Sequence, residues 1–190
     1  NIYVMIRHDV EKSREMVMRF SDLLSHQLYD SGKKQVPVEQ EVRCLTNYIE
    51  LEKIRQGDAV DIHEDLLEKS QLEVAPLLFL PIVENAFKHG LAAGMDVYRL
   101  EVSLKEESQG IYFRCSNEYQ QGKSGKKGGI GLENVRKRLE LLYPNQHQFR
   151  IQDDGRRFTV EIHLDKLTTA PQLENDTEHE QKLQVITSKK

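Results

Sequence analysis

The sequence lacks the features that mark secreted, membrane-spanning and strongly charged proteins. Among its 190 residues there are two cysteines, Cys44 and Cys115, far apart and without a CxxC pair or a histidine-rich neighbour. This pattern indicates neither a disulfide framework nor a zinc site, and it fits a reducing compartment. No apolar run reaches the roughly 18 to 20 residues that a membrane span needs, and no signal peptide is present. The formal net charge of −4 provides no general attraction to nucleic acid or membrane surfaces.

Common nucleotide-binding fingerprints and internal repeats are absent as well. Gly122-Lys123-Ser124 is similar to the end of a P-loop, but Asn117 stands where the first glycine of that motif belongs. No GxGxxG follows a predicted strand, which excludes the dinucleotide-binding fingerprint. The chain begins without Met and its first residues already have the pattern of a helix interior, so we expect it to be a piece of a longer protein.

The most informative stretch is Pro76–Gly90, PLLFLPIVENAFKHG. Its first part is apolar nearly all round, which is typical of a buried helix. Asn85, Lys88 and His89 then follow at i, i+3 and i+4 and therefore share one face. Gly90 is predicted to end the helix. Two interpretations stay open: these are satisfied polar residues of a core, or an amide, an ammonium and an imidazole leave the core together to bind a ligand.

The remaining pattern predicts an α/β (α+β) two-layer sandwich, in which a mixed sheet carries helices on one face. Residues 1–30 place apolar side chains at helical steps, and this long N-terminal helix either packs on its own domain or meets a partner helix. The other predicted elements are a helix over Val38–Gln56, a strand over Ala59–Leu67, a hairpin of Val97–Glu106 and Ile111–Cys115, an amphipathic helix over Glu133–Leu142 and a hairpin of Phe149–Ile151 and Phe158–Leu164.

The polar residues of the first two helices are predicted to be structurally ordinary. His8 and His26 are interpreted as surface residues or members of the apolar stripe, without a chemical role. The solvated side of the second helix is predicted to consist mostly of Glu41, Glu50, Glu52, Lys53 and Arg55.

A second informative segment is Gln120–Gly129, QQGKSGKKGG, which has no apolar residue and is predicted to be a mobile loop. Its glycines let the backbone approach an anion, and the following helix offers unpaired N–H groups to phosphate. Lys126 and Lys127 add positive charge. The segment is either a solvated linker or a polyphosphate-binding loop. In the second case Asn85 is a candidate oxygen ligand of Mg²⁺, and Asn117 is placed to hydrogen-bond a base edge.

Three separated motifs then resemble, in the same order, the sensor histidine kinases of the LytS/YehU type. They are NYIELEKIR at 47–55, PLLFLPIVENAFKHG at 76–90 and GIGLENVRKRLELLYP at 129–144, and the resemblance covers about Val36 to Leu164. It implies the Bergerat-type ATP-binding fold of the larger group that includes gyrase and MutL. It also implies that ATP with Mg²⁺ donates its γ-phosphoryl group to a histidine, for relay to a response regulator.

The resemblance implies nucleotide-binding roles position by position. Asn85 matches the Mg²⁺-binding asparagine, Lys88 and His89 match the residues after it that face the nucleotide, and Asn117 matches the aspartate that reads the adenine amino group. Residues 120–128 match the mobile lid. The resemblance also implies nucleotide-binding residues in the lid and at its phosphate-binding end: Lys126, Lys127, Gly129, Ile130, Gly131 and Leu132.

The chain departs from the family pattern at several positions. Asn117 is an amide where most relatives have a carboxylate, which removes charge assistance of about 1 kcal/mol. Glu118, Tyr119 and Gln121 stand where glycines usually follow, and Pro81 occupies the position of the general-base glutamate of hydrolysing members, which argues against a simple ATPase. The family's phosphoacceptor motif, similar to NPHFLFN, is absent and would fall just before the first residue.

These implications divide the chain into three parts. Residues 1–35 are predicted as the end of a dimerisation and phosphoacceptor region, 36–166 as the ATP-binding catalytic domain and 167–190 as a disordered polar tail. We expect a homodimer through the N-terminal helix, a response regulator as partner and no nucleic acid. We expect a cytoplasmic location, with a bacterial inner membrane reached only through missing segments. The chain should bind ATP without phosphorylating itself.

Two other functions remain open. The first is a non-catalytic signalling scaffold with a decayed nucleotide pocket, which the departures at Asn117, Glu118 and Tyr119 suggest. The second is a protein-serine kinase of the anti-sigma type, which has a similar asparagine box.

Overall fold

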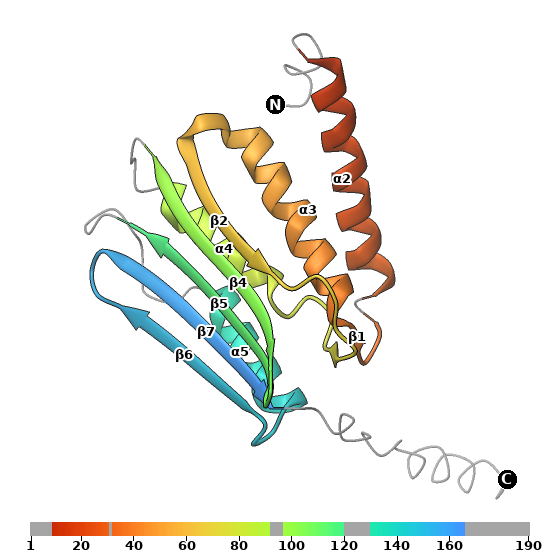
Figure 1. Cartoon of the computed structure of the whole chain (residues 1–190), viewed down its shortest axis with the longest axis vertical. Helices are drawn as coiled ribbons and strands as arrows, with labels where there is room; N and C mark the ends of the chain where they lie inside the picture. The colour runs from red at the N-terminus through yellow and green to blue at the C-terminus, as the bar shows by residue number, and fades with distance from the viewer. Residues whose placement is uncertain (1–8, 31, 92–96, 120–129, 166–190) are drawn as a thin grey trace, which may run out of the picture.

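The computed structural model describes residues 9–30, 32–91, 97–119 and 130–165 (Figure 1). In chain order the elements are α2 (Val10–Tyr29), β1 (Val36–Pro37), α3 (Val38–Gln56), the 3-10 turn η1 (Gly57–Ala59), β2 (Val60–Leu66), β3 (Glu73–Val74), α4 (Leu80–Leu91), β4 (Tyr98–Glu107), β5 (Gly110–Glu118), α5 (Ile130–Leu142), β6 (His147–Asp153) and β7 (Arg157–Asp165). The predicted tail and the predicted lid lie outside the described residues.

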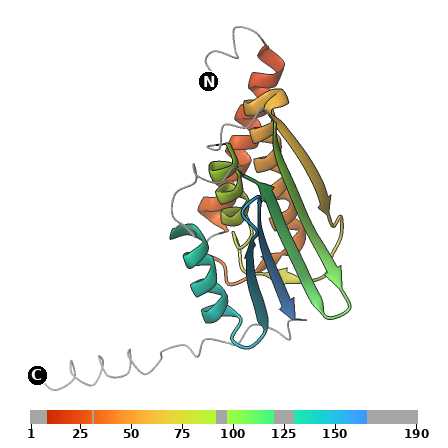
Figure 2. The same cartoon turned by 90° about the vertical axis from the view of Figure 1, so that its left-hand side faces the viewer.

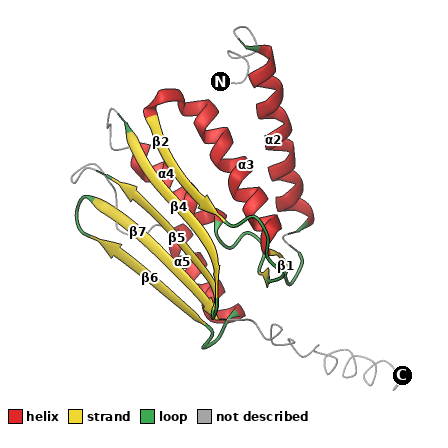
Figure 3. Cartoon of the chain, in the orientation of Figure 1, coloured by secondary structure: helices red, strands yellow, loops and turns green. Residues whose placement is uncertain are grey.

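One layer of the molecule is a five-stranded sheet in the order β2-β4-β5-β7-β6 (Figure 3). β2 and β4 are parallel, whereas the other neighbours are antiparallel, so the sheet is mixed. Alternation in the sequence sets the two faces, because successive residues of a strand point to opposite sides. In β4 the buried members are Tyr98, Leu100, Val102 and Leu104. The short strands β1 and β3 form a separate antiparallel pair.

The second layer consists of helices on one face of this sheet (Figure 2). α4 packs on β4 and β5, α5 packs beside α4, and α3 packs against α4 and β2. The Phe79 and Phe113 rings stack with centroids 4.7 Å apart and join the segment before α4 to β5. α2 lies outside, against α3 (Figure 1). The prediction of an α/β sandwich with a mixed sheet, helices on one face and a long N-terminal helix is confirmed.

The outer face of the sheet is polar. Glu101 accepts hydrogen bonds from Arg114 and Arg157, both at 3.0 Å, and Tyr112 donates to Glu161 at 2.7 Å. Partial burial acts in the opposite direction, but the two arginines still lower the pKa of Glu101. This face is therefore covered by paired charges on neighbouring strands, and the apolar core is confined to the helical side.

The hairpin between β4 and β5 turns where the sequence predicted it. Glu107 pairs with Gly110 across the turn, and Gly110 also pairs with Asp165 of β7. Gly110 has φ +149°, and a Cβ atom there would lie 1.8 Å from the Leu164 carbonyl oxygen. Close approach of a neighbouring backbone therefore requires glycine at this position.

Several predicted boundaries need correction. The apolar stretch does not become helical at Pro76, because Leu77 has φ +54°, which a right-handed helix excludes. α4 instead begins at Leu80 and continues through Gly90 to Leu91. β5 extends to Glu118, beyond the predicted end at Cys115. In the described part of the chain, no helix is both long enough and apolar enough to span a bilayer.

Candidate functional site

The helix that carries Asn85 is held firmly in the core. The Tyr98 hydroxyl donates to the Ala86 carbonyl at 2.7 Å. The Phe87 ring meets Tyr48 edge-on at 5.7 Å and Tyr98 at 6.1 Å. These contacts fix the rotation of α4 about its own axis, and thereby fix which face holds the polar residues.

Asn85 lies at the border between the buried and exposed sides of α4. Glu84 and Lys88 are exposed, whereas Asn85 is half-buried. The buried side of the helix consists of Leu80, Ile82, Val83, Ala86 and Phe87. His89 belongs to α4 by its backbone, and its side chain lies outside the description. An amide at such a border reaches both the protein interior and a ligand bound from outside.

Asn117 lies on the face of β5 that the helices cover. It shares this face with Ile111, Phe113 and Cys115, since alternate residues of a strand point the same way. Its side chain is 4% exposed, and its amide nitrogen donates to the Glu118 carbonyl at 3.2 Å. The predicted base-binding residue is thus buried beneath the helical layer, near the end of its strand.

The first turn of α5 completes the described part of the site. Leu132 is buried, while Gly131 is half-buried, and among the described residues no atom lies within 4 Å of a Cβ atom placed at Gly131. Ile130 is the first residue of the helix. The predicted site residues Lys126, Lys127 and Gly129 lie outside the described residues.

Three elements thus bring the described candidates to one side of the sheet. α4, which carries Asn85 and Lys88, packs against both β5 and α5 (Figure 2). β5 contributes Asn117, and α5 contributes the N–H groups of its first turn. A helix N-terminus beside an amide-bearing helix can bind an anion and its metal.

Comparison with known proteins finds similarity to histidine kinases. Residues 1–60 match the family described as "Histidine kinase". The sensor protein LytS of Oceanobacillus iheyensis is 26% identical over 182 residues, which cover 86% of this chain and 31% of LytS. The sensor histidine kinase YpdA of Escherichia coli is 25% identical over 179 residues, covering 88% of this chain and 31% of YpdA. In sequence, this chain is similar to the sensor histidine kinases of the LytS/YpdA type.

The match to these sensor kinases is partial in length. The chain spans 31% of both LytS and YpdA, and 69% of Bacillus subtilis YwpD, to which it is 24% identical over 191 residues. Its sequence is similar to that part of these sensor histidine kinases.

Solved structures agree on the fold. One similar structure is the histidine kinase domain of a blue-light-activated kinase from Erythrobacter litoralis EL346, with a TM-score of 0.55 at 14% identity. The match covers 85% of this chain and 84% of that domain. The Acinetobacter baumannii histidine kinase AdeS has a TM-score of 0.52 at 13% identity and covers 86% of this chain and 83% of its own.

The loop at Ala75–Leu78, which leads into α4, is hydrogen-bonded to Arg138 of α5 and to Tyr143 directly after α5. Arg138 donates to the Leu77 carbonyl at 3.0 Å and to the Pro76 carbonyl at 2.8 Å. The Ala75 N–H donates to the Tyr143 hydroxyl at 2.6 Å. These bonds satisfy backbone groups that the turn leaves without helical partners. They also fix α4 relative to α5.

Glu41 of α3 holds the same loop from the other side. Its Oε1 accepts from the Leu77 N–H at 2.7 Å and its Oε2 from the Leu78 N–H at 3.0 Å. Glu41 is 1% exposed, so its predicted place on a solvated side is wrong. A signal was present in the sequence, because Glu41 follows Val38 by three residues and precedes Leu45 by four, on the apolar face.

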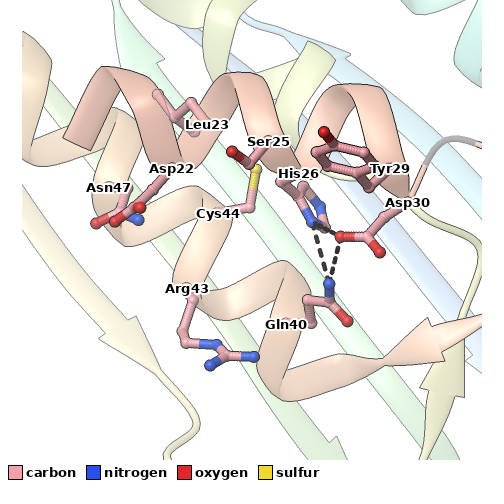
Figure 4. A pocket seen from close by; sticks show the side chains of 10 residues that line it. All are labelled: Asp22, Leu23, Ser25, His26, Tyr29, Asp30, Gln40, Arg43, Cys44 and Asn47. Carbon is pink, nitrogen blue, oxygen red and sulfur yellow. Dashed lines mark hydrogen bonds and ion pairs between the residues drawn. The ribbon is translucent and has the colours of Figure 1, made fainter. Parts of the chain in front are cut away.

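His26 of α2 completes this buried polar cluster. Its Nε2 lies 3.1 Å from Glu41 Oε1 and its Nδ1 lies 2.8 Å from Asp30 Oδ2. Gln40 donates to Asp30 as well, beside a cavity of about 370 Å³ between α2 and α3 (Figure 4). The hydrogen bond to Glu41 raises the pKa of His26 against the opposing effect of burial, and Asp30 adds to the rise. His26 lies on the buried stripe, but the interpretation that it has no chemical role is incomplete.

The solvated-side prediction is wrong for Glu52 too. Glu52 is 5% exposed and accepts from Arg55 at 2.6 Å. Partial desolvation and the nearby Glu52 carboxylate together raise the pKa of Glu84 on the exposed side of α4. The residue just before Asn85 therefore holds its proton more tightly than an ordinary glutamate.

Tyr119, which follows the last residue of β5, has a structural role. Its N–H donates to the Arg156 carbonyl at 2.8 Å, and its hydroxyl donates to Asp153. Both bonds join the end of β5 to the turn between β6 and β7. Tyr119 thus strengthens the end of the sheet beside Asn117.

Proposed function

We propose that the chain binds ATP with Mg²⁺ and transfers the γ-phosphoryl group to a histidine N-terminal to this segment, for relay to a response regulator. One observation supports this most directly. α4 with Asn85 packs against β5 with Asn117 and against α5, whose first turn faces the same side of the sheet. The amide proposed to bind the metal, the buried amide proposed to bind the base and the helix terminus proposed to bind phosphate therefore lie on one side of the sheet.

Each residue has a role that fits its surroundings. The half-buried Asn85 supplies an amide oxygen to Mg²⁺, a cation that prefers oxygen ligands and keeps several waters. The buried Asn117 accepts a hydrogen bond from the adenine amino group, without the charge assistance of a carboxylate. The N–H groups at Ile130 and Gly131 bind phosphate oxygens. Lys88 and His89, on the same helix face, neutralise phosphate charge.

The donor set fits a metal that arrives with its nucleotide. Within the described ranges, no group of three or more His, Cys, Asp or Glu side chains could hold a metal ion. A magnesium ion bridging phosphates needs only one or two protein oxygens, and Asn85 can provide one. Lys126, Lys127 and Gly129 would add contacts to the phosphates. Catalysis by these residues rests on positioning and on neutralising charge while the γ-phosphoryl group passes from ATP to the histidine.

We also propose that α2 forms a homodimer with a second copy. Val10, Val17 and Leu24 recur every seven residues, Leu28 continues the line, and all four are exposed. Seven-residue spacing is typical of a seam between two helices. This seam is separate from the face against α3, which contains Ser13, Met16, Leu23 and His26. A Leu24→Glu variant is expected to sediment as a monomer, and a dimer that persists in it would contradict this seam.

The proposed division of labour follows from these parts. Residues 1–35 belong to the dimerisation region, 36–166 to the ATP-binding domain and 167–190 to a tail. In the whole protein, this region would lie in the cytoplasm and reach the membrane only through other segments.

Equilibrium dialysis with labelled ATP and Mg²⁺ tests the site. Asn85→Ala is expected to weaken binding by about tenfold or more, because a hydrogen-bonding or metal-binding group is lost from a half-buried position. Asn47→Ala is the matched control, since Asn47 lies on α3 and accepts from Arg19 at 3.1 Å. Equal binding by Asn85→Ala and the wild type would exclude the site. No binding by the wild type at millimolar ATP would favour the scaffold function instead.

A further inference from the structure

We propose that Glu41 is a positioning residue that couples the position of α2 to the loop at Ala75–Leu78. Through this loop it would also influence the orientation of α4. The inference rests on the proposed nucleotide role of α4. It assigns to His26, on the N-terminal helix, an influence on a nucleotide site that it does not touch. Three observations support it: the shared oxygen of Glu41, the conformation of Leu77 and the cavity beside His26.

The coupling passes through one oxygen atom. Glu41 Oε1 accepts from the Leu77 N–H at 2.7 Å and lies 3.1 Å from His26 Nε2. A displacement of the imidazole therefore changes the hydrogen bonding and the direction of the carboxylate that holds the loop. Glu41 is buried, so water does not readily replace a lost partner.

The loop depends on such external partners. Leu77 has φ +54°, a conformation that a leucine rarely adopts unless its surroundings impose it. Its N–H is bound by Glu41 from α3 and its carbonyl by Arg138 from α5. α4 begins three residues later, at Leu80. A loop that is hydrogen-bonded to two helices can change its conformation when the hydrogen bond to one of them weakens.

The surroundings of His26 leave room for movement of α2. The main packing partner of α2 is α3, and a cavity of about 370 Å³ lies between the two helices beside His26 (Figure 4). Tyr29 of α2, Asp30 directly after α2 and Gln40 of α3 are among the residues that line this cavity. A rotation or shift of α2, driven from its N-terminal end, would therefore act on Glu41 through His26.

Three variants separate this coupling from simple loss of helix packing. His26→Leu removes the donor to Glu41, whereas His26→Gln keeps a side-chain N–H that can reach it. Arg19→Leu removes a different hydrogen bond between α2 and α3, that from Arg19 to Asn47 at 3.1 Å, which does not involve the loop. Circular dichroism and thermal melting would first select the variants that remain folded.

The measurements are amide hydrogen exchange at Leu77 and Leu78 and the affinity for ATP with Mg²⁺. In His26→Leu we expect these two amides to exchange about tenfold faster or more, since a charge-assisted hydrogen bond is weakened, and ATP binding to weaken in parallel. His26→Gln should restore both values toward those of the wild type. Arg19→Leu should change neither, although it removes a contact between the same helices.

Each outcome decides the inference. Unchanged exchange at Leu77 and Leu78 in His26→Leu overturns it, and so does equal acceleration in Arg19→Leu, which would show only a general effect of α2 packing. A wild-type chain that binds no ATP would refute the proposed nucleotide function. In that case the amide exchange alone still decides whether Glu41 couples α2 to the loop.

Discussion

Removal of the Tyr143 hydroxyl is expected to destabilise the protein well beyond the usual effect of deleting one oxygen atom. Tyr143 is 1% exposed, and its hydroxyl accepts from the Ala75 N–H at 2.6 Å. In Tyr143→Phe this buried N–H loses its partner, while the ring still fills the same space. An unsatisfied buried donor costs about 1–3 kcal/mol. For a chain of this length, that corresponds to a fall in melting temperature of roughly 2–12 °C.

Tyr112→Phe provides the matched control, because it removes the same atom from the polar face of the sheet. The Tyr112 hydroxyl donates to Glu161 at 2.7 Å at a half-buried position, where water can replace the phenol. We expect a loss of about 0.5 kcal/mol or less for it. Thermal and urea unfolding of both variants, followed by circular dichroism, would compare them directly. Equal losses would refute the argument that Tyr143 holds the loop before α4.

Three more predictions concern stability. Glu41→Gln is expected to lower the free energy of unfolding in urea by about 2–4 kcal/mol, since its amide NH₂ must oppose one buried N–H. The control Glu50→Gln, on the same helix, should lower it by less than about 0.5 kcal/mol. Similar losses in the two variants would contradict the buried role of Glu41. The pKa of His26 is raised above 6.5, so the stabilisation by His26 is complete below that pH and is lost as pH rises through the folded-state pKa. Thermal melts at increasing pH should show this loss. A His26→Gln variant whose melting temperature depends on pH in the same way as that of the wild type would contradict the role of His26. Gly110→Ala should cost roughly 3 kcal/mol or more of unfolding free energy, because its Cβ would meet a backbone carbonyl. Gly131→Ala is the control, since no described atom lies within 4 Å of the Cβ that it would add. A Gly110→Ala variant as stable as the wild type would disprove the close approach.

Much of the fold could be predicted from short-range patterns. Alternation predicted the central strands, and the apolar face of Val38–Gln56 predicted α3 with its observed bounds. The apolar run before Asn85 predicted the buried helix, because side chains that are apolar on all sides have no solvated face to present. These signals lie within one element, so the sequence contains them without reference to the rest of the molecule.

The polar interior could not be predicted in the same way. Glu41 is separated by 36 residues from Leu77, whose N–H it accepts. Charge alone placed Glu41 in solvent, and only its position on the apolar stripe indicated otherwise. The positive φ of Leu77 likewise results from partners on two other helices, which no local pattern specifies. Whether Asn85 and Asn117 bind a nucleotide stays a prediction.

The charge lattice on the outer side of the sheet has a consequence for how two copies can sit together. Glu101, Arg114 and Arg157 form a hydrated surface that would lose its water if two sheets stacked. Such stacking is therefore disfavoured. In the proposed dimer, we expect the two copies to meet along α2, with the outer faces of their sheets left in water.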